Sequence, residues 1–237
     1  MDVLFIIFAA LFPAVLLWAY IWRKDQKKEP FSWLAKATMY GVVICFPVAI
    51  VELIIGNILF YPDGNPTTVF GTTANAFLVA AIPEESFKLL ALWLVLRKNP
   101  FFDEHFDGIV YAVCVGLGFA AVENIMYIFS EEDWFATAIA RALLAVPGHY
   151  AFAILMGYYY SVYHFVDHSP KIAACILLVP MLAHGAYDAI AMSGMVHPYI
   201  EGVSFFVLVY FCVKMHKVAK NKVIALVEKD QNNHYRV

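Results

Sequence analysis

Long apolar runs, separated by short polar segments, dominate the chain. An α-helix needs about 20 mostly apolar residues to cross the hydrocarbon core of a bilayer. The runs that meet this length are residues 3–22, 36–60, 74–96, 106–129, 136–163, 171–192 and 199–219. The pattern therefore predicts an all-α polytopic membrane protein with about seven transmembrane helices.

The connections between these runs are short, and no internal repeat, linker or low-complexity segment divides the chain. We therefore expect a single transmembrane helical domain over residues 1–220, followed by a polar cytoplasmic tail over residues 221–237. The first run has no basic segment before it and no small-residue cleavage site after it, so it is predicted to be a retained helix rather than a signal peptide.

Basic residues mark one side of the predicted membrane protein. Of the 16 lysines and arginines, all except Lys88 and Arg141 lie in or beside alternate connections and in the tail. The intervening connections, "YPDGNPTTVFGTT", "SEEDW" and "SGMVHPYIEG", contain neither lysine nor arginine. Because cytoplasmic loops carry the excess of positive charge, we expect the N-terminus outside and the C-terminus in the cytoplasm, in a multi-pass protein of the cell membrane.

Composition agrees with a membrane protein. The chain is 62% hydrophobic and 15% charged, with a mean hydropathy of +0.70, whereas a soluble domain is nearer half apolar and a quarter charged. The net charge of −3 and the lack of a basic stripe argue against a nucleic-acid partner. The four cysteines are single and far apart, which matches neither a disulfide framework nor a zinc cluster. The lipid bilayer is thus an expected partner, and the oligomeric state stays open.

Ionisable and polar side chains interrupt four of the predicted spans. Such groups are expensive in hydrocarbon, at roughly 3 kcal/mol on insertion scales, and they usually mark functional sites. At 1.5 Å per residue, they fall between the bilayer midplane and its outer face. The residues expected to act in the site are Glu84, Glu85, Glu123, His149 and His184, with Lys88, Asn124 and Asp188 in support. We expect them to surround one hydrated pocket.

Spacing relates some of these residues to one another. Glu84 and Lys88, like His184 and Asp188, are i,i+4 pairs on one helix face. Glu85 is turned by about 100° from Glu84, so the two carboxylates cannot point the same way. One of them is expected to meet reactants while the other holds Lys88 or a neighbouring helix.

Glutamate and histidine suit hydrolysis by activated water. A buried carboxylate can act as a general base, and a histidine can orient the water or donate to an oxyanion. No Ser–His or Cys–His arrangement, aspartate pair within spans or HExxH motif stands out. No cofactor is required for this chemistry. A divalent metal such as zinc stays an alternative, and its ligands would come from Glu84, Glu85, Glu123, His149 and His184.

Four short motifs, taken in order, resemble those of a known family. "EESFK" matches EExxK, "FAAVEN" matches FxxxEN, "PGH" supplies a histidine, and "HGAYD" matches HxxxD. The set, between about residues 70 and 192, resembles the PrsW family of intramembrane proteases. It is similar, more distantly, to the CAAX-processing and bacteriocin-processing endopeptidases.

The resemblance implies a glutamate-dependent membrane peptidase that makes the first, extracytoplasmic-side cut in an anti-sigma factor. By that analogy Glu84 is the base, Glu85 its partner, and His184 the oxyanion donor with Asp188 behind it. The chain departs from the more distant enzymes by carrying Glu123 in place of a histidine and Asp188 in place of an asparagine. Because an ionised carboxylate cannot donate a hydrogen bond, Asp188 orients His184, or the oxyanion site is built differently, or a metal takes that role.

The prediction is therefore an intramembrane endopeptidase that cleaves a single-span membrane protein near its extracytoplasmic side. One alternative is a metal-dependent hydrolase that uses the same glutamates and histidines. A second is a proton-coupled transporter or a non-catalytic membrane scaffold, because acids and histidines within spans also build proton relays.

Overall fold

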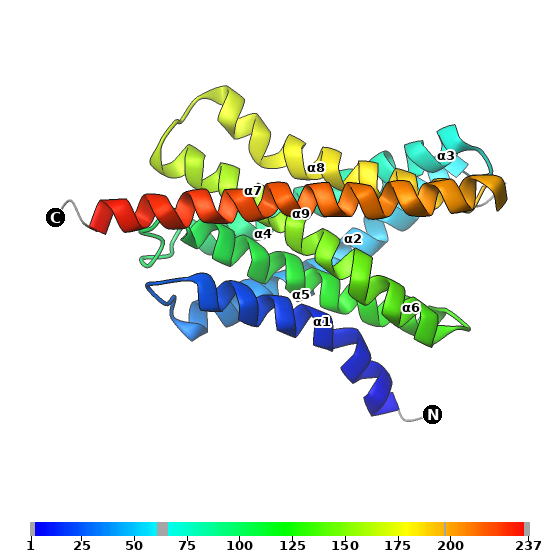
Figure 1. Ribbon diagram of the computed structural model, residues 1–237, viewed down its shortest axis with the longest axis horizontal. Coiled ribbons are helices and arrows are strands. Elements are labelled where there is room, and N and C mark those ends of the chain that lie inside the picture. Colours follow the sequence, from blue (N-terminus) through cyan, green and yellow to red (C-terminus); the bar gives the residue numbers. More distant parts are fainter. Residues whose placement is uncertain (1–2, 61–65, 197, 235–237) are drawn as a thin grey trace.

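The structure is a computed structural model that describes residues 3–60, 66–196 and 198–234, and all its regular elements in these ranges are helices, as the apolar pattern predicts. They pack side by side, with the two chain ends at opposite ends of the bundle (Figure 1). The elements are α1 (Val3–Lys24), α2 (Phe31–Phe60), α3 (Val69–Ala74), the π-helical η1 (Asn75–Ala81), α4 (Ile82–Leu96), α5 (Asp107–Ser130), α6 (Trp134–Ala140), the π-helical η2 (Arg141–Ala145), α7 (Val146–Phe165), α8 (Pro170–Ser193) and α9 (Pro198–His234).

Helix α5 forms the centre of the bundle, since every residue from 107 to 120 is buried. It packs against α1, α2, α4 and α7. Its crossing with α2 is so close that a Cβ added at Gly118 would overlap the backbone oxygen of Thr38, and one added at Gly41 would overlap that of Val115. Small residues allow this approach between helices in membranes. The crossing fixes α5, and therefore Glu123, against its neighbours.

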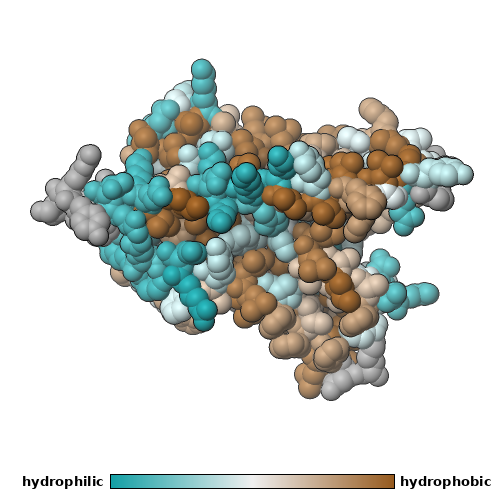
Figure 2. All heavy atoms as spheres, in the orientation of Figure 1, coloured by the Kyte–Doolittle hydropathy of each residue, from teal (hydrophilic) through white to brown (hydrophobic). Residues whose placement is uncertain are grey.

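Among the described residues, six helical stretches are long and apolar enough to cross a membrane. They are α1, α2, α5, the continuous stretch Trp134–Phe165 (α6, η2 and α7), α8 and most of α9. Large apolar side chains remain exposed on their outer faces, and apolar residues cover much of the flank of the molecule (Figure 2). A surface of this kind suits lipid, so the chain is a multi-pass membrane protein.

The predicted span at residues 74–96 differs from the others. It lies in a continuous helical stretch, α3, η1 and α4, that runs from Val69 to Leu96 and is not among the six apolar stretches. The physical reason is its charge, because Glu84, Glu85 and Lys88 all lie in it. The π-helical turn, in which the Ile82 N–H donates to Phe77 O, ends just before Pro83. Single π-helical turns often occur next to functional sites.

The segment predicted to be a polar tail continues helix α9 as far as His234. Val223 and Leu226 are buried in the main core. Farther along, Asp230 accepts hydrogen bonds from the backbone N–H groups of His105 and Phe106. No structural break therefore marks residue 220, and the tail packs against the bundle. Residues 235–237 lie outside the described ranges.

The two ends of the bundle differ in character. One end carries the α1–α2, α4–α5 and α7–α8 connections and the C-terminal part of α9, while the other carries the N-terminus, α3 and the start of α6 (Figure 1). Hydrophilic residues gather at the first end (Figure 2), which we call the basic end because Arg23, Lys24, Arg97 and Lys98 lie there. That this end faces the cytoplasm stays a prediction from the charge pattern.

Candidate active site

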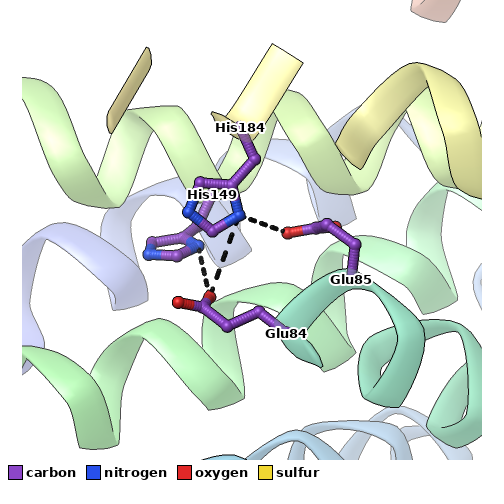
Figure 3. Close-up of side chains that lie close together, drawn as sticks. All are labelled: Glu84, Glu85, His149 and His184. Carbon is purple, nitrogen blue, oxygen red and sulfur yellow. Dashed lines mark hydrogen bonds and ion pairs between the residues drawn. The ribbon is translucent and has the colours of Figure 1, made fainter. Parts of the chain in front are cut away.

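The polar residues predicted from the sequence meet inside the bundle, on four different helices. They are Glu84, Glu85 and Lys88 on α4, Glu123 and Asn124 on α5, His149 on α7, and His184 and Asp188 on α8. In Figure 3 the carboxylates from α4 point toward the imidazole rings from α7 and α8. The arrangement is a single buried cluster rather than four separate polar spots.

Lys88 connects the acids to the histidines. Its Nζ donates to Glu84 Oε2 at 2.9 Å and to Glu85 Oε1 at 2.8 Å, and it lies 3.1 Å from His149 Nδ1. It also lies 4.3 Å from the centre of the Phe119 ring. The lysine is only 3% exposed, so its three donors are directed at groups of the cluster. The expected i,i+4 pairing of Glu84 with Lys88 is present, and Glu85 shares the same ammonium.

These contacts define the tautomer of His149. An ammonium only donates, so Nδ1 of His149 must accept from Lys88 and the ring proton must lie on Nε2. That nitrogen is 2.7 Å from Glu123 Oε2, to which it donates. His149 is therefore neutral and oriented from both sides, one side by α4 and the other by α5.

Glu123 has a second partner at the edge of the cluster. The Nη2 atom of Arg141 donates to Glu123 Oε2 at 2.8 Å, and its Nε donates to Asn124 Oδ1 at 2.7 Å. Asn124 in turn donates to the backbone oxygen of Ala10 at 2.6 Å. In the motif "FAAVEN", Glu123 thus contacts His149, and Asn124 bonds both Arg141 and the α1 backbone. Arg141 therefore pairs with Glu123 and, through Asn124, is tied to α1.

His184 lies between two carboxylates. Its Nδ1 is 2.8 Å from Glu85 Oε1 and its Nε2 is 3.2 Å from Asp188 Oδ2. The first contact is a hydrogen bond, and the second lies within ion-pair distance, so a carboxylate faces each ring nitrogen. Phe152 stacks on it at 4.7 Å between ring centres, with an angle of 20° between the planes. Asp188 therefore orients His184, which is one of the roles left open by the sequence.

The two adjacent glutamates differ in the surroundings of their second oxygen. Glu85 is fully buried, and its Oε2 has no hydrogen-bond partner among the described residues. Glu84 bonds Lys88 through Oε2, and no described residue bonds its Oε1, which is not among the fully enclosed unpartnered atoms. Glu84 Oε1 is therefore the carboxylate oxygen of this pair that water can approach.

Aromatic residues complete the walls of the cluster and were not singled out from the sequence. Phe119 covers Lys88, and Phe152 covers His184. Helical spacing offers a partial signal for both, since Phe152 lies three residues after His149 and Phe119 lies four before Glu123. In a chain with 20 phenylalanines, however, that spacing does not distinguish these two from ordinary core residues.

The donor set also fits a metal in its chemistry. One ligand atom from each of Glu84, Glu85, His149 and His184 lies within 4.8 Å of the other three, and all four residues are buried. Two imidazoles with carboxylates are zinc-type ligands. Three of these residues, however, bond the Lys88 ammonium. A metal at the centre of the cluster would require Lys88 to withdraw. Glu123 is not one of the four converging residues, because it bonds the far side of His149.

Comparison with known proteins identifies the family. A family model described as "PrsW family intramembrane metalloprotease" matches residues 29–215. This chain belongs to the PrsW family. It is 32% identical to Protease PrsW of Geobacillus kaustophilus (strain HTA426) over 217 residues, covering 91% of this chain and 92% of the relative. It is 33% identical to Protease PrsW of Bacillus subtilis (strain 168), covering 78% and 82%. No solved structure matches the chain.

Membership of the PrsW family makes the chain an intramembrane protease. The buried cluster of glutamates and histidines is the candidate active site of that PrsW enzyme. The transporter and scaffold alternatives find no support in these relatives, each of which is named as a protease.

Proposed function

We propose that this PrsW protein cleaves a single-span membrane protein by direct attack of water, with Glu84 as the general base. The observation that carries the proposal is the difference between the two adjacent glutamates. No described residue bonds Glu84 Oε1, whereas Glu85 is enclosed and bonded to Lys88 and His184. A base must reach the proton that it removes, and this geometry favours Glu84.

Lys88 and Glu85 orient the Glu84 carboxylate. The Lys88 ammonium holds Glu84 through one oxygen and leaves the other oriented for a water molecule. Glu85 shares the ammonium and contacts His184, so it links the base to the opposite wall of the cluster. When Glu84 takes a proton from water, the hydroxide adds to the peptide carbonyl, and the proton passes to the leaving amine.

His184 is our candidate for the group that stabilises the oxyanion. Its contact with Glu85 is the shorter one, and its contact with Asp188 is longer, at 3.2 Å. Asp188 is also the more exposed of these two carboxylates, at 23% of its side chain. The Nε2–H group is therefore the donor that a substrate oxygen could take over. Removing an oxyanion donor of this type typically costs about 100- to 1000-fold in turnover.

His149, Glu123 and Arg141 position the site. His149 accepts a hydrogen bond from Lys88 and donates one to Glu123 on α5. It therefore fixes the Lys88 ammonium, which bonds Glu84, relative to α5. Arg141 balances the charge of Glu123. In this account Glu123 positions the catalytic residues and does not contact the substrate.

The position of the cluster supports a cut near the extracytoplasmic side. Glu123 and His184 lie nearer the C-terminal ends of α5 and α8 than their N-terminal ends. Those ends belong to the end of the bundle opposite the basic end (Figure 1). If the basic end is cytoplasmic, as the positive-inside pattern predicts, the substrate bond lies in the outer half of the bilayer. The segment around that bond must unwind, because a helix hides its peptide bonds.

A metal-dependent reaction at the same cluster is the second candidate. It is favoured by the convergence of four ligand atoms within 4.8 Å and by the family description as a metalloprotease. Glu84, Glu85, His149 and His184 would hold the ion, which when bound would lower the pKa of water and polarise the carbonyl. In that case Lys88 would leave its three partners. The first candidate keeps Lys88 where it lies.

The experiment is cleavage by the purified enzyme in liposomes, with candidate single-span substrates and mass-spectrometric mapping of the cut. We expect one endoproteolytic cut in the outer half of the substrate's span, absent with the Glu84→Gln variant. A cut on the cytoplasmic side would contradict the proposed depth. Cleavage by Glu84→Gln at the wild-type rate would contradict the proposed base.

A further inference from the structure

A second cluster of buried acids lies at the basic end, away from the protease site. One carboxylate oxygen from each of Asp25, Glu104 and Asp107 lies within 4.8 Å of the other two, and all three residues are buried. Asp25 follows α1, Glu104 belongs to the α4–α5 connection, and Asp107 opens α5. The cluster therefore joins two connections that are far apart in sequence.

Two of these acids keep an oxygen without a partner. Asp25 is 2% exposed and Asp107 is 0% exposed, yet Oδ1 of each has no hydrogen-bond partner in the part of the chain that the structure describes. The hydrogen bonds to their carboxylates that the described residues supply come from backbone N–H groups, Glu29 and Lys27 to Asp25, and Asp103 and Glu104 to Asp107. Buried polar atoms in native proteins are almost always paired, and an unpaired one often indicates an ion or a water.

The neighbouring cations do not fill this gap. The Lys28 ammonium donates to the backbone oxygens of Trp22 and Asp25. Lys27 pairs with Asp103 in an exposed ion pair. Within the described residues, no side chain donates a hydrogen bond to the carboxylate of Asp25 or of Asp107. Three buried acids thus face one another without a cationic side chain bonded to Asp25 or Asp107, which is costly unless another cation is present.

We propose that Asp25, Glu104 and Asp107 bind a hard divalent cation, Ca²⁺ or Mg²⁺, which holds the α1–α2 connection against the start of α5. A donor set made only of carboxylate oxygens suits these ions rather than zinc. An ion about 2.3–2.6 Å from each oxygen places the oxygens at most about 5 Å apart, in agreement with the observed convergence. The site is structural and independent of the proposed protease chemistry.

The test uses the full-length protein in detergent micelles, stripped with a chelator and then titrated with CaCl₂ or MgCl₂. At a concentration 100 times the dissociation constant, we expect the melting temperature to rise by about 5–10 °C. Terbium provides a direct signal, because Tyr111 lies one helical turn after Asp107 and can sensitise its luminescence. We expect terbium luminescence that added Ca²⁺ or Mg²⁺ removes, and the more effective ion identifies the natural ligand.

Variants separate this site from general charge effects. Asp25→Asn and Asp107→Asn should abolish the cation-dependent shift while keeping or raising the melting temperature without cation, because an unpaired buried charge is gone. Glu228→Gln removes an exposed acid on α9 toward the basic end and should keep the full shift. Glu84→Gln should keep it too, which excludes binding at the protease site.

Either of two results would overturn the proposal. One is a wild-type protein whose melting temperature and terbium luminescence do not respond to either cation. The other is an undiminished shift in both asparagine variants. If an asparagine variant fails to fold, the wild-type terbium titration and its displacement still decide the question.

Discussion

Replacement of Lys88 by methionine is expected to destabilise the protein far more than the loss of an ordinary surface charge. The ammonium bonds Glu84, Glu85 and His149, and both ion pairs are almost fully enclosed, with side-chain exposures of 5% or less. Removing one member of a buried ion pair typically costs about 3–5 kcal/mol, because the remaining charge is left without compensation. Here two carboxylates lose the same partner, so we expect Lys88→Met to lower the free energy of unfolding by at least about 3–5 kcal/mol.

The assay is equilibrium unfolding in mixed micelles with increasing SDS, followed by tryptophan fluorescence. A matched control is Lys27→Met, which breaks the exposed pair with Asp103, whose side chains are 56% and 50% exposed. That change should cost no more than about 1 kcal/mol. The pair Glu85→Gln and Lys88→Met adds a double-mutant cycle. The double variant should be more stable than the sum of the single losses predicts, by about 1–3 kcal/mol.

A Lys88→Met protein that unfolds within about 1 kcal/mol of the wild type would show that the ammonium does not stabilise the buried carboxylates. Single losses of stability that simply add in the double variant would show that Glu85 and Lys88 do not depend on each other. A large loss for Lys27→Met would indicate that the assay reports general charge effects and not the buried cluster.

The remaining predictions concern positioning, packing and metal. Arg141→Lys should lower the cleavage rate by about tenfold or more, because one ammonium cannot reproduce the planar donors to Glu123 and Asn124; an unchanged rate would argue against this role. Gly118→Ala should cost about 1–3 kcal/mol in the same unfolding assay, since its Cβ would overlap Thr38 O; wild-type stability would contradict that packing. Treatment with a zinc chelator should leave cleavage intact while Lys88 holds its partners, and loss of activity restored by zinc would favour the metal-dependent candidate.

The sequence alone was sufficient to predict the fold class, and it grouped glutamates and histidines that the structure brings close together. Both depend on the same physical rule, that hydrocarbon excludes charge. Long apolar runs were therefore predicted to span the membrane. The acids and histidines within them were predicted to face one another inside the protein rather than the lipid. Glu84, Glu123, His149 and His184 do meet in one buried cluster.

The pairing within the cluster could not be predicted, because it depends on how the helices are rotated and placed. Local spacing indicated Glu84 with Lys88 and His184 with Asp188, and both contacts are present. Nothing local, however, connects Lys88 to His149 or Glu85 to His184. The tautomer of His149 follows only from such a long-range contact.

The helical continuation of the polar tail was not predicted, for a different reason. Hydropathy falls after residue 219, so the segment reads as polar on average. A stripe at helical spacing nevertheless continues through it, with Met215, Ala219, Val223 and Leu226 all buried. Periodicity was the better guide there than mean hydropathy.

If Glu84 activates the attacking water, the loss of its carboxylate must slow the chemical step, which the single-turnover cleavage rate of Glu84→Gln measures. The enzyme should be in excess over a reconstituted single-span substrate, with unfolding curves confirming that the variant is folded. We predict a rate at least about 100-fold below wild type, within the range expected for loss of a general base. A folded Glu84→Gln enzyme that cleaves at a rate close to wild type would contradict the account.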